Sequence, residues 1–563
     1  MSDRLAIAIA QTNPVVGDIA GNLDRIRRAR AEAGQGGADL VVFSELVLLG
    51  YPPEDLVLKP AFQQRAEKAV RILAKETADG GPAVILGSCW ADDGGVYNAS
   101  FLLADGEIAA VRYKYDLPNY GVFDEKRVFR PGPLPEPMVL PLKGGGLVRL
   151  GVMICEDLWS ENVAEHLARW GADIFVVING SPFEDTKFSA RYGHAEARVR
   201  ENGIPLIYVN QVGGQDELVF DGASFVLGRD GTPRFLAPSW AEDVAVTHWE
   251  YRPHEGWTCA GSTLAPAPEG HEAIYQAMML GLRDYVNKNG FPGVLLGMSG
   301  GIDSAVSAAV AVDALGPERV RGVMMPSRFT SAGSLNDSAE MARLMGFLYD
   351  NIPIEPAVET FADMLSGVFA GTTPDTTEEN IQARIRGVIL MALSNKFGHM
   401  LLTTGNKSEM SVGYATLYGD MAGGYSVLKD IYKTEVYALA RWRNQNRPAG
   451  ALGPDGRVIP EHVITRAPSA ELRADQTDQD TLPDYAVLDD ILYCLVEEDM
   501  SVDEIAARGH APEVVERVEK MLYVAEYKRR QAPPGVKITR RTFGRDRRYP
   551  ITNRFRTTQQ PIE

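Results

Sequence analysis

Short apolar runs separated by amphipathic stretches recur along the chain, and this alternation limits the folds that it can adopt. Helical patterns lie between several of the runs, for example Leu23, Ile26 and Ala29 ahead of the glycine-rich break at 34–37. The length and composition of the runs are typical of buried strands. The first half is therefore predicted to form an α/β domain with a buried sheet. Its expected strands cover residues 5–10, 40–43, 83–87, 99–103, 150–154, 174–178 and 206–209.

The alternation stops near residue 250 and begins again near residue 270. The intervening residues hold Pro253, Pro266 and Pro268 and little periodicity, which is typical of a linker. A chain of 563 residues is also too long for a single ordinary core. We therefore predict two domains, at residues 1–250 and 271–563, joined by a linker at 251–270.

The second half repeats the order strand, loop, helix. A helix is expected over residues 272–289 and a strand over 293–296, followed by a glycine-rich loop and an alanine-rich helix that ends at Leu315. This order predicts a doubly wound parallel sheet. Residues 443–478 are rich in Pro, Gly, Asn and Asp and are expected to be loop-like. Further strands are expected at 321–325 and 399–403.

Charge and cysteine content exclude several classes of protein. The formal net charge of −18 argues against binding to nucleic acid or to an anionic membrane surface. There is no stretch of about 18 uncharged apolar residues that could span a membrane, and residues 1–11 do not have the pattern of a signal peptide. The four cysteines lie far apart and form no CxxC pair, which argues against a zinc site and a disulfide framework. We expect a cytoplasmic protein.

The sequence GMSGGIDS at residues 297–304 lies between a predicted strand and a predicted helix. Small residues let the backbone approach a phosphate closely, and a helix N-terminus offers free N–H groups and a positive dipole. The loop lacks the Gly-Lys-Ser/Thr ending of the common P-loop. It resembles instead the SGGxDS loop of the N-type ATP pyrophosphatases. Those enzymes cleave ATP to AMP and pyrophosphate and thereby activate a carboxylate or carbonyl group.

Other segments of the second half resemble the motifs of NAD synthetases, in the same order. The resemblance covers about residues 272–538. It implies that ATP activates deamido-NAD as its adenylate, with Mg²⁺ and lysines offsetting the developing charge, and that ammonia then displaces AMP. The matching segments are ENIQARIR at 379–386, TTGNKSE at 403–409, Gly419 and Asp420 followed by Lys429 and Lys433, PSAELR at 468–473 and KRR at 528–530.

The resemblance implies a role for each matching residue. Mg²⁺ would be bound by Asp303 and Glu409, because Mg²⁺ prefers carboxylate and phosphate oxygens. Deamido-NAD would be contacted by Asn380, Glu409 and Lys528. The residues implied to bind ATP are Gly297, Met298, Ser299, Gly300, Gly301, Ile302, Asp303, Ser304, Thr404, Lys433 and Ser469.

Glu45, Lys114 and Cys155 stand out in the first half, since Glu45 and Cys155 end predicted strands. A carboxylate, an amine and a thiol in one α/β domain form a candidate active site. A cysteine nucleophile needs a base, so Glu45 is a candidate acceptor of the thiol proton. Lys114 is a candidate for stabilising an oxyanion. A buried cysteine without such neighbours is more often a core residue, which is our interpretation of the other three.

These segments resemble the nitrilase superfamily, whose members hydrolyse C–N bonds with a Glu–Lys–Cys triad on an α-β-β-α sandwich. The resemblance covers about residues 5–249. The stretch LPNYGVFDE at residues 117–125 is similar to the glutaminase domain of NAD synthetases. The match implies that Tyr120, Ser181 and Lys187 hold the glutamine.

An amidase joined to an ATP-dependent activator has a use for its ammonia. Free ammonia is mostly protonated at neutral pH, so coupling its release to its consumption raises its effective concentration. We therefore expect ammonia channelling, and the family's synthetase domain implies a homo-oligomer built on synthetase-domain dimers. Two alternatives are another glutamine-fed ATP pyrophosphatase, such as a GMP or asparagine synthetase, and a nucleotide-sensing protein with degenerate catalytic domains. The Glu–Lys–Cys set and the domain order disfavour the first, and the presence of every key residue disfavours the second.

Overall fold

The computed structural model describes residues 4–92 and 94–555, and the chain divides into two compact units between Pro268 and Glu269. No helix within the described residues is long and apolar enough to cross a membrane.

The first unit contains two seven-stranded sheets that pack face to face. Side chains from both sheets, such as Ile9 of the first and Val176 of the second, share one buried cluster. The first sheet consists, in spatial order, of β15 (Gly256–Ala260), β14 (Asp243–Arg252), β1 (Arg4–Gln11), β2 (Leu40–Val42), β3 (Ala83–Asp92), β4 (Gly95–Ala104) and β5 (Glu107–Tyr113). The second consists of β16 (Thr263–Leu264), β13 (Pro233–Leu236), β12 (Phe225–Leu227), β9 (Leu206–Asn210), β8 (Ile174–Asn179), β7 (Leu147–Ile154) and β6 (Met138–Pro141).

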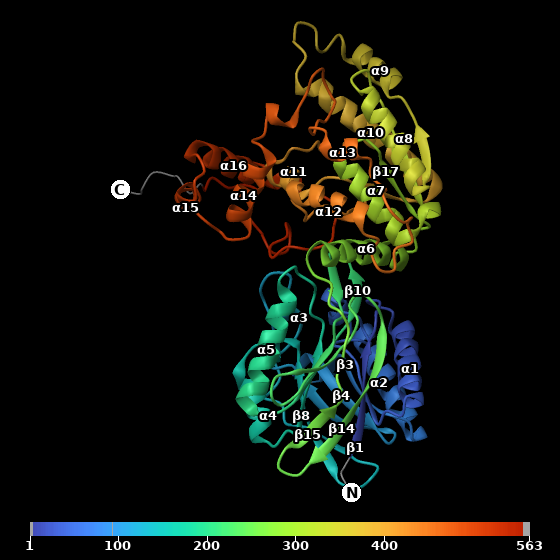
Figure 1. The fold of residues 1–563 in the computed structure, drawn as a ribbon, viewed down its shortest axis with the longest axis vertical. Coiled ribbons are helices and arrows are strands. Elements are labelled where there is room, and N and C mark those ends of the chain that lie inside the picture. The colour runs from blue at the N-terminus through green and yellow to red at the C-terminus, as the bar shows by residue number, and fades with distance from the viewer. Residues whose placement is uncertain (1–3, 93, 556–563) are drawn as a thin grey trace. The chain divides into compact units, whose positions relative to one another are not determined.

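Helices cover the outer face of each sheet. The apolar side of α1 (Ile19–Gln35) and α2 (Pro60–Glu76) packs on the first sheet, and that of α4 (Glu161–Arg169) and α5 (Lys187–Asn202) packs on the second. Figure 1 shows the two pairs on opposite sides of the strands. The predicted α-β-β-α sandwich is confirmed. Its shorter elements are η1 (Glu54–Leu58), η2 (Thr77–Asp79), α3 (Glu125–Val128), η3 (Cys155–Leu158) and the hairpin of β10 (Val212–Gln215) and β11 (Leu218–Asp221).

Residues 251–270 differ from the linker that the prolines predict. β15 pairs with β14, and β16 pairs with β13, so both strands extend the sheets of the first unit. Trp257 of β15 is buried in the cluster between the two sheets. The strands are too short to show a period in the sequence, and for this reason their composition resembles that of a linker.

The second unit contains a five-stranded parallel sheet with the spatial order β19-β18-β17-β20-β21. Numbered from the first strand of the unit, this order is 3-2-1-4-5, as in a doubly wound fold, and it confirms that prediction. The order reverses between β17 and β20, where the connections leave in opposite directions. The strands are β17 (Val294–Gly297), β18 (Val320–Met324), β19 (Leu348–Asn351), β20 (Met400–Thr403) and β21 (Tyr425–Ser426).

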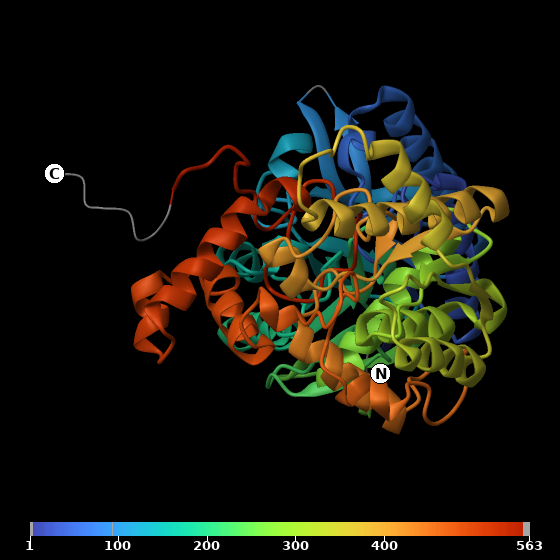
Figure 2. The ribbon, with the colours of Figure 1, turned by 90° about the horizontal axis from the view of Figure 1, so that it is seen from above.

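Helices surround this sheet and form a separate C-terminal group. Side chains of α10 pack with Leu295, Val323 and Leu401 of the central strands. The C-terminal helices α14–α16 have their own buried cluster, and Figure 2 shows them (red) gathered to one side of the sheet-bearing part of the same unit. The helices are α6 (Gly270–Lys288), α7 (Ile302–Leu315), η4 (Pro317–Arg319), α8 (Ala332–Met345), α9 (Glu355–Leu365), α10 (Thr376–Phe397), α11 (Lys407–Val412), α12 (Lys433–Gln445), α13 (Glu461–Thr465), η5 (Asp478–Asp480), α14 (Tyr485–Val496), α15 (Val502–Ala507), α16 (Pro512–Val524) and α17 (Glu526–Arg529).

Candidate active sites

Glu45, Lys114 and Cys155 come together at strand ends of the first unit. Lys114 directly follows β5, Cys155 directly follows β7, and Glu45 lies in the loop after β2. Lys114 Nζ donates a hydrogen bond of 2.7 Å to Glu45 Oε1. The charges of both residues act on the thiol of Cys155, and all three side chains are buried. The structure therefore assembles the three residues that the sequence singles out.

Further hydrogen bonds fix this buried ion pair. Glu45 accepts from Asn98 Nδ2 at 2.7 Å and from the backbone N–H of Gly180 at 2.8 Å. Lys114 Nζ also donates to Glu125 Oε1 at 2.8 Å. Buried charges need such partners, because an unpaired one is costly to desolvate. Burial alone would lower the pKa of Lys114, but the two carboxylates raise it well above its ordinary value, so the amine stays charged.

Glu125 is a further member of this network, and the sequence predicts no role for it. It lies on α3, eleven positions after Lys114, inside the stretch that carries the resemblance to glutaminase domains. Tyr51 donates its hydroxyl to Glu125 Oε1 at 2.8 Å. Burial raises the pKa of Glu125 to about 7. Its position in the LPNYGVFDE stretch is the signal by which it could have been found.

Cys155 stands at a strained turn between β7 and η3. Its φ is 48°, in the left-handed region that side chains with a Cβ rarely adopt. Burial and the carboxylate of Glu45 raise the pKa of the thiol well above its ordinary value, and Lys114 only partly opposes this. The resting residue is therefore a thiol, and an attack by sulfur needs a base to take its proton.

The three residues implied to bind glutamine lie around this turn. The hydroxyl of Tyr120 donates to Glu156, the residue after Cys155, at 2.9 Å. Lys187 begins α5, and its Nζ lies 5.5 Å from the ring centroid of Trp159, which follows η3. Ser181 follows the glycine that is bonded to Glu45, and its backbone N–H donates to Asn210 Oδ1 at 3.0 Å. All three therefore belong to the surroundings of the cysteine.

Arg191 of α5 adds a buried positive charge that no sequence pattern indicates. Its Nη1 donates to Asp221 Oδ1 at 2.9 Å, and Asp221 ends the β10–β11 hairpin. Burial lowers the pKa of Arg191, but the carboxylate of Asp221 outweighs that effect and raises it. Among the described residues its Nε and Nη2 have no hydrogen-bond partner.

The predicted phosphate loop of the second unit joins β17 to α7, beside the point where the strand order reverses. Ligands of doubly wound folds bind at this point, at the carboxyl ends of the strands. Gly301 N–H donates to Ser299 Oγ at 3.2 Å, and Ser299 Oγ lies 3.2 Å from Ser304 Oγ. At Gly300 φ is +77°, and a Cβ would meet the backbone oxygen of Ser334 at 2.6 Å, so only glycine fits there.

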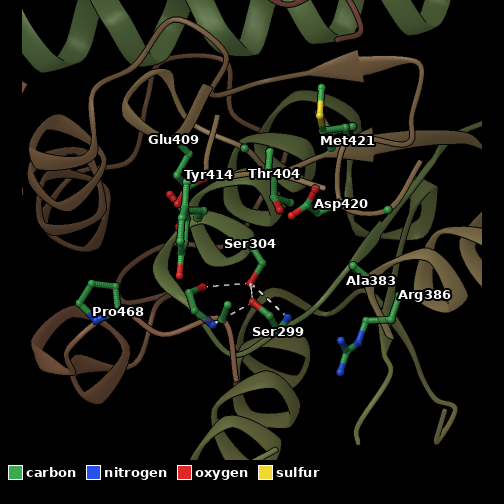
Figure 3. A pocket seen from close by; sticks show the side chains of 18 of the residues that line it. Ser299, Ser304, Ala383, Arg386, Thr404, Glu409, Tyr414, Asp420, Met421 and Pro468 are labelled. Carbon is green, nitrogen blue, oxygen red and sulfur yellow. Dashed lines mark hydrogen bonds between the residues drawn. The ribbon is translucent and has the colours of Figure 1, made fainter. Parts of the chain in front are cut away.

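The loop borders a cavity of about 290 Å³. Figure 3 shows Ser299 and Ser304 on its wall, between Pro468 and Arg386. Most of the residues implied to bind ATP line this cavity: Gly297, Met298, Ser299, Gly301, Ile302, Asp303, Ser304, Thr404, Lys433 and Ser469. Glu409 also lines it, whereas Gly300, Asn380 and Lys528 are not part of the lining.

Asp303, Glu409 and Lys433 form a charged cluster in the cavity. Lys433 Nζ donates to Asp303 Oδ2 at 2.6 Å and to Glu409 Oε1 at 3.1 Å. Asn406 Nδ2 donates to the other oxygen of Asp303 at 2.8 Å. Burial raises the pKa of Glu409 to about 8. Burial would lower the pKa of Lys433, but the two carboxylates raise it above its ordinary value.

Two carboxylates that converge on one cation are a suitable donor set for Mg²⁺. Mg²⁺ is commonly held by one or two carboxylates, with phosphate oxygens and water completing its octahedron. Within residues 4–92 and 94–555, no group of three or more His, Cys, Asp and Glu side chains is placed to hold a metal ion by itself. Asp303 and Glu409 therefore fit a magnesium ion that arrives together with a nucleotide.

Asn380 and Lys528 both form hydrogen bonds with the loop at residues 413–416. Lys528 Nζ donates to the backbone oxygens of Gly413 at 2.7 Å and Ala415 at 2.6 Å. Asn380 Oδ1 accepts from the hydroxyl of Thr416 at 2.8 Å. Tyr414 and Ala415 of this loop line the cavity. Asn380 and Lys528 therefore shape the cavity through this loop.

Comparisons of the chain with protein families and with known proteins bear on these sites. Residues 6–250 match the carbon-nitrogen hydrolase family, and residues 274–532 match the NAD synthase family. The chain is 50% identical over 556 residues to the glutamine-dependent NAD(+) synthetase of Rhodobacter capsulatus, with 99% of this chain and 100% of that protein covered. It is 45% identical over 551 residues to that of Acinetobacter baylyi, with 98% of each covered.

A solved structure agrees with both matches. The glutamine-dependent NAD(+) synthetase of Acinetobacter baumannii, determined with ADP, is 43% identical and superposes with a TM-score of 0.77 over 98% of this chain and 99% of that one. The chain belongs to the family of glutamine-dependent NAD(+) synthetases. It is therefore a ligase that uses glutamine as its amide donor.

Six charged residues that line the synthetase cavity have no role predicted from the sequence, namely Arg386, Asp420, Lys429, Arg466, Glu471 and Asp478. Burial lowers the pKa of Arg386 to about 10 and raises that of Asp420 to about 6. Four of the six stand inside segments that carry the family resemblance, Arg466 stands just before PSAELR and Asp478 stands after it. Their proximity to those motifs was the available signal, but a motif does not show which of its side chains face a ligand.

Proposed function

We propose that the chain converts deamido-NAD to NAD(+) in two coupled steps, with AMP, pyrophosphate and glutamate as the other products. The observation that carries the proposal is the presence of two assembled sites on one chain. One is a buried Glu45–Lys114 pair beside Cys155, and the other is a glycine-rich loop at the switch point of a doubly wound sheet. The first can release ammonia from an amide, and the second can activate a carboxylate.

In the glutaminase step, Glu45 accepts the thiol proton of Cys155 and the sulfur attacks the amide carbon of glutamine. The developing oxyanion lies near the ammonium group of Lys114, which stabilises it. The proton returns to the leaving nitrogen and ammonia departs, leaving a thioester that water hydrolyses to glutamate. Tyr120, Ser181 and Lys187 hold the rest of the glutamine; their position around the Cys155 turn supports this role.

In the synthetase step, the backbone of residues 297–304 and the N-terminus of α7 hold the phosphates of ATP. Asp303 and Glu409 would hold Mg²⁺, which offsets phosphate charge when bound. Thr404, Lys433 and Ser469 orient the nucleotide from the cavity wall. A carboxylate oxygen of deamido-NAD attacks the α-phosphorus, the bond to the β-phosphate breaks, and ammonia then displaces AMP from the adenylate.

Asn380, Glu409 and Lys528 contact deamido-NAD in this proposal. The support is their placement: Glu409 lines the cavity, and the other two fix the loop at 413–416 that borders it. Lys528 Nζ donates to two carbonyls of that loop, so a dinucleotide that contacts this lysine would also set the position of the loop.

We also propose that ammonia is channelled between the sites and that the protein is a homo-oligomer built on dimers of its synthetase unit. Water would protonate ammonia released into solution, so a closed route favours the reaction. Large apolar side chains stand exposed on α9, α10 and the segment between them, including Met364, Val368 and Val388. Such a surface is typical of a subunit interface. We expect the protein in the cytoplasm, where its free cysteines stay reduced.

The decisive test uses a Cys155→Ala variant with ATP and deamido-NAD. With glutamine as donor, formation of NAD(+) should fall by on the order of 10³-fold or more, because the nucleophile is lost. With an ammonium salt as donor, formation of NAD(+), AMP and pyrophosphate should continue at the rate of the unaltered protein. Cys89→Ala, which removes another buried thiol, is the matched control. Loss of both activities in Cys155→Ala would contradict the two-site proposal.

A further inference from the structure

Arg466 reaches the phosphate loop from a segment that the family motifs do not include. It directly follows α13 and lines the synthetase cavity. Its Nη1 donates to Ser334 Oγ at 2.8 Å, and its Nη2 donates to the backbone oxygen of Gly300 at 3.4 Å. Gly300 lies in the middle of the loop at 297–304, so this hydrogen bond places the guanidinium against the loop.

Glu471 is the anionic partner of Arg466 in this structure. Its Oε1 accepts from Ser334 Oγ at 2.8 Å and lies 3.8 Å from Arg466 Nη1. Its Oε2 accepts from the backbone N–H of Ser331, which caps α8, at 3.4 Å. The φ of Glu471 is 48°, so the segment adopts an unfavourable backbone conformation where this carboxylate is presented.

Lys433 and Arg466, two of the cations that line the cavity, differ in how firmly carboxylates hold them. Lys433 is bound by two carboxylates at 2.6 and 3.1 Å. Among the described residues, the carboxylate nearest to Arg466 is 3.8 Å away, and the side chain of Arg466, which lines the cavity, retains 23% exposure. A guanidinium that is loosely paired and faces a ligand site is ready to exchange its partner for a phosphate, whose oxygens it can bind bidentately.

Breaking the bond between the α- and β-phosphates creates the need for such a cation. The electron pair of that bond stays on the bridging oxygen, so negative charge grows on the departing pyrophosphate. We propose that Arg466 binds the β- and γ-phosphates of ATP and stabilises the pyrophosphate as it leaves, and that Glu471 holds Arg466 over the phosphate loop until ATP arrives. This inference rests on the proposed function of the synthetase unit.

The test measures deamido-NAD-dependent exchange between ATP and pyrophosphate in the full-length protein, without glutamine. Arg466→Ala should raise the KM for ATP and the KM for pyrophosphate by about 10–100-fold, the effect of losing a charge-assisted hydrogen bond. The KM for deamido-NAD should stay within about twofold of the unaltered protein's value. Arg466→Lys keeps the positive charge but cannot donate two parallel hydrogen bonds, so its KM values for ATP and pyrophosphate should lie between those of Arg466→Ala and the unaltered protein.

Two further variants separate this role from a structural one. Arg457→Ala removes an exposed arginine of the same unit, paired with Glu340 at 3.2 Å, and should leave all three KM values unchanged. Glu471→Gln removes the negative charge that is paired with Arg466 in the absence of ATP. Arg466 is then still able to bind the phosphates, so the KM for ATP should not rise. A rise like that of Arg466→Ala would overturn the assigned role of Glu471.

The outcomes distinguish this inference from the proposal on which it rests. If the unaltered protein shows no deamido-NAD-dependent exchange, the proposed function itself is wrong. If it exchanges normally and Arg466→Ala matches Arg457→Ala, only the role of Arg466 is overturned. If Arg466→Ala raises the KM for deamido-NAD as much as that for ATP, Arg466 is a structural residue of the cavity and the inference is again wrong.

Discussion

The two active sites treat their charges in opposite ways. In the amidase site Lys114 and Glu45 are fully buried, and each carboxylate of the network is paired before any substrate enters. In the synthetase site Asp303 and Glu409 keep 17% and 16% exposure of their side chains at the cavity. Each unit therefore has a cluster of one lysine and two carboxylates, which is buried in the first unit and borders the ligand cavity in the second.

The difference follows from what each reaction needs. A cysteine amidase brings its own nucleophile, base and oxyanion donor, so the protein can fix all three in advance. An ATP-cleaving ligase receives most of its charge with the substrate, and its cations and carboxylates must change partners when phosphates and Mg²⁺ arrive. We therefore expect that loss of a buried charge in the amidase site lowers both activity and stability. Loss of a charge in the synthetase site, where charged groups exchange partners when ligands bind, should lower activity more than stability.

The largest effect is expected for Lys114→Met. Within the described residues, it removes the one cation that is paired with Glu45 and Glu125 and leaves two buried carboxylates without a positive partner. Glutamine hydrolysis should fall by on the order of 10³-fold, and the free energy of unfolding of the first unit by about 3–5 kcal/mol. Glutamate release and thermal denaturation measure the two effects. Lys143→Met, which removes an exposed lysine paired with Asp39 at 3.2 Å, is the control. A melting temperature equal to the control's would show that this pair is not what stabilises the site.

Lys433→Met should separate activity from stability in the other unit. Asp303 and Glu409 border the cavity, so water or Mg²⁺ can replace the lost ammonium group. We expect ammonium-dependent NAD(+) formation to fall by about 10²-fold, with a smaller loss of melting temperature than Lys114→Met causes. Steady-state rates with ammonium and thermal denaturation give both quantities. Equal destabilisation by the two variants would remove the distinction between a sealed and an open cluster.

Glu125→Gln should change how stability responds to pH. The folded protein holds a proton on Glu125 up to a pKa of about 7, against an ordinary value of 4.5, so between these values the folded state binds more protons than the unfolded state. The contribution of Glu125 to stability is therefore fully present below pH 4.5 and is lost as the pH rises through 7. The unfolding free energy of the unaltered protein, relative to Glu125→Gln, should fall across this range by about 3 kcal/mol. Urea denaturation at several pH values measures it, and a difference that is constant with pH would refute the assignment.

The two sites also differ in how much of them could be predicted from the sequence. Glu45, Cys155 and the loop at 297–304 follow apolar strands, and strand ends in α/β folds gather at one edge. The local pattern therefore locates them. Glu125 and Arg191 lie on helices, and only the tertiary fold brings them to Cys155. No sequence period marks a contact of that kind.

The same limit applies to the fold. The central strands of both units are long apolar runs, and the predictions at 5–10, 150–154 and 293–296 match β1, β7 and β17. Strands such as β5 and β16 lie at sheet edges and have exposed or partly exposed residues, so they lack the apolar pattern. Such edge strands form because a neighbouring strand pairs with them. Residues 251–270 therefore resemble a linker in sequence, although β15 and β16 belong to sheets.

The smallest effect is expected at the rim of the amidase site, where Tyr120→Phe removes a hydroxyl that donates to Glu156 at 2.9 Å. Tyr120 keeps 51% exposure, so water can replace its hydrogen bond to Glu156 in the free protein, which is not possible for the sealed Lys114 pair. The KM for glutamine should rise by about three- to tenfold, the effect of one neutral or charge-assisted hydrogen bond, while stability stays unchanged. Tyr113→Phe, which removes a hydroxyl paired with Asp92 at 3.3 Å, is the matched control and should leave the KM unchanged. A loss for Tyr120→Phe as large as that for Lys114→Met would mean that the rim is as rigidly organised as the triad, and the contrast between sealed and open charges would then not hold within the amidase site.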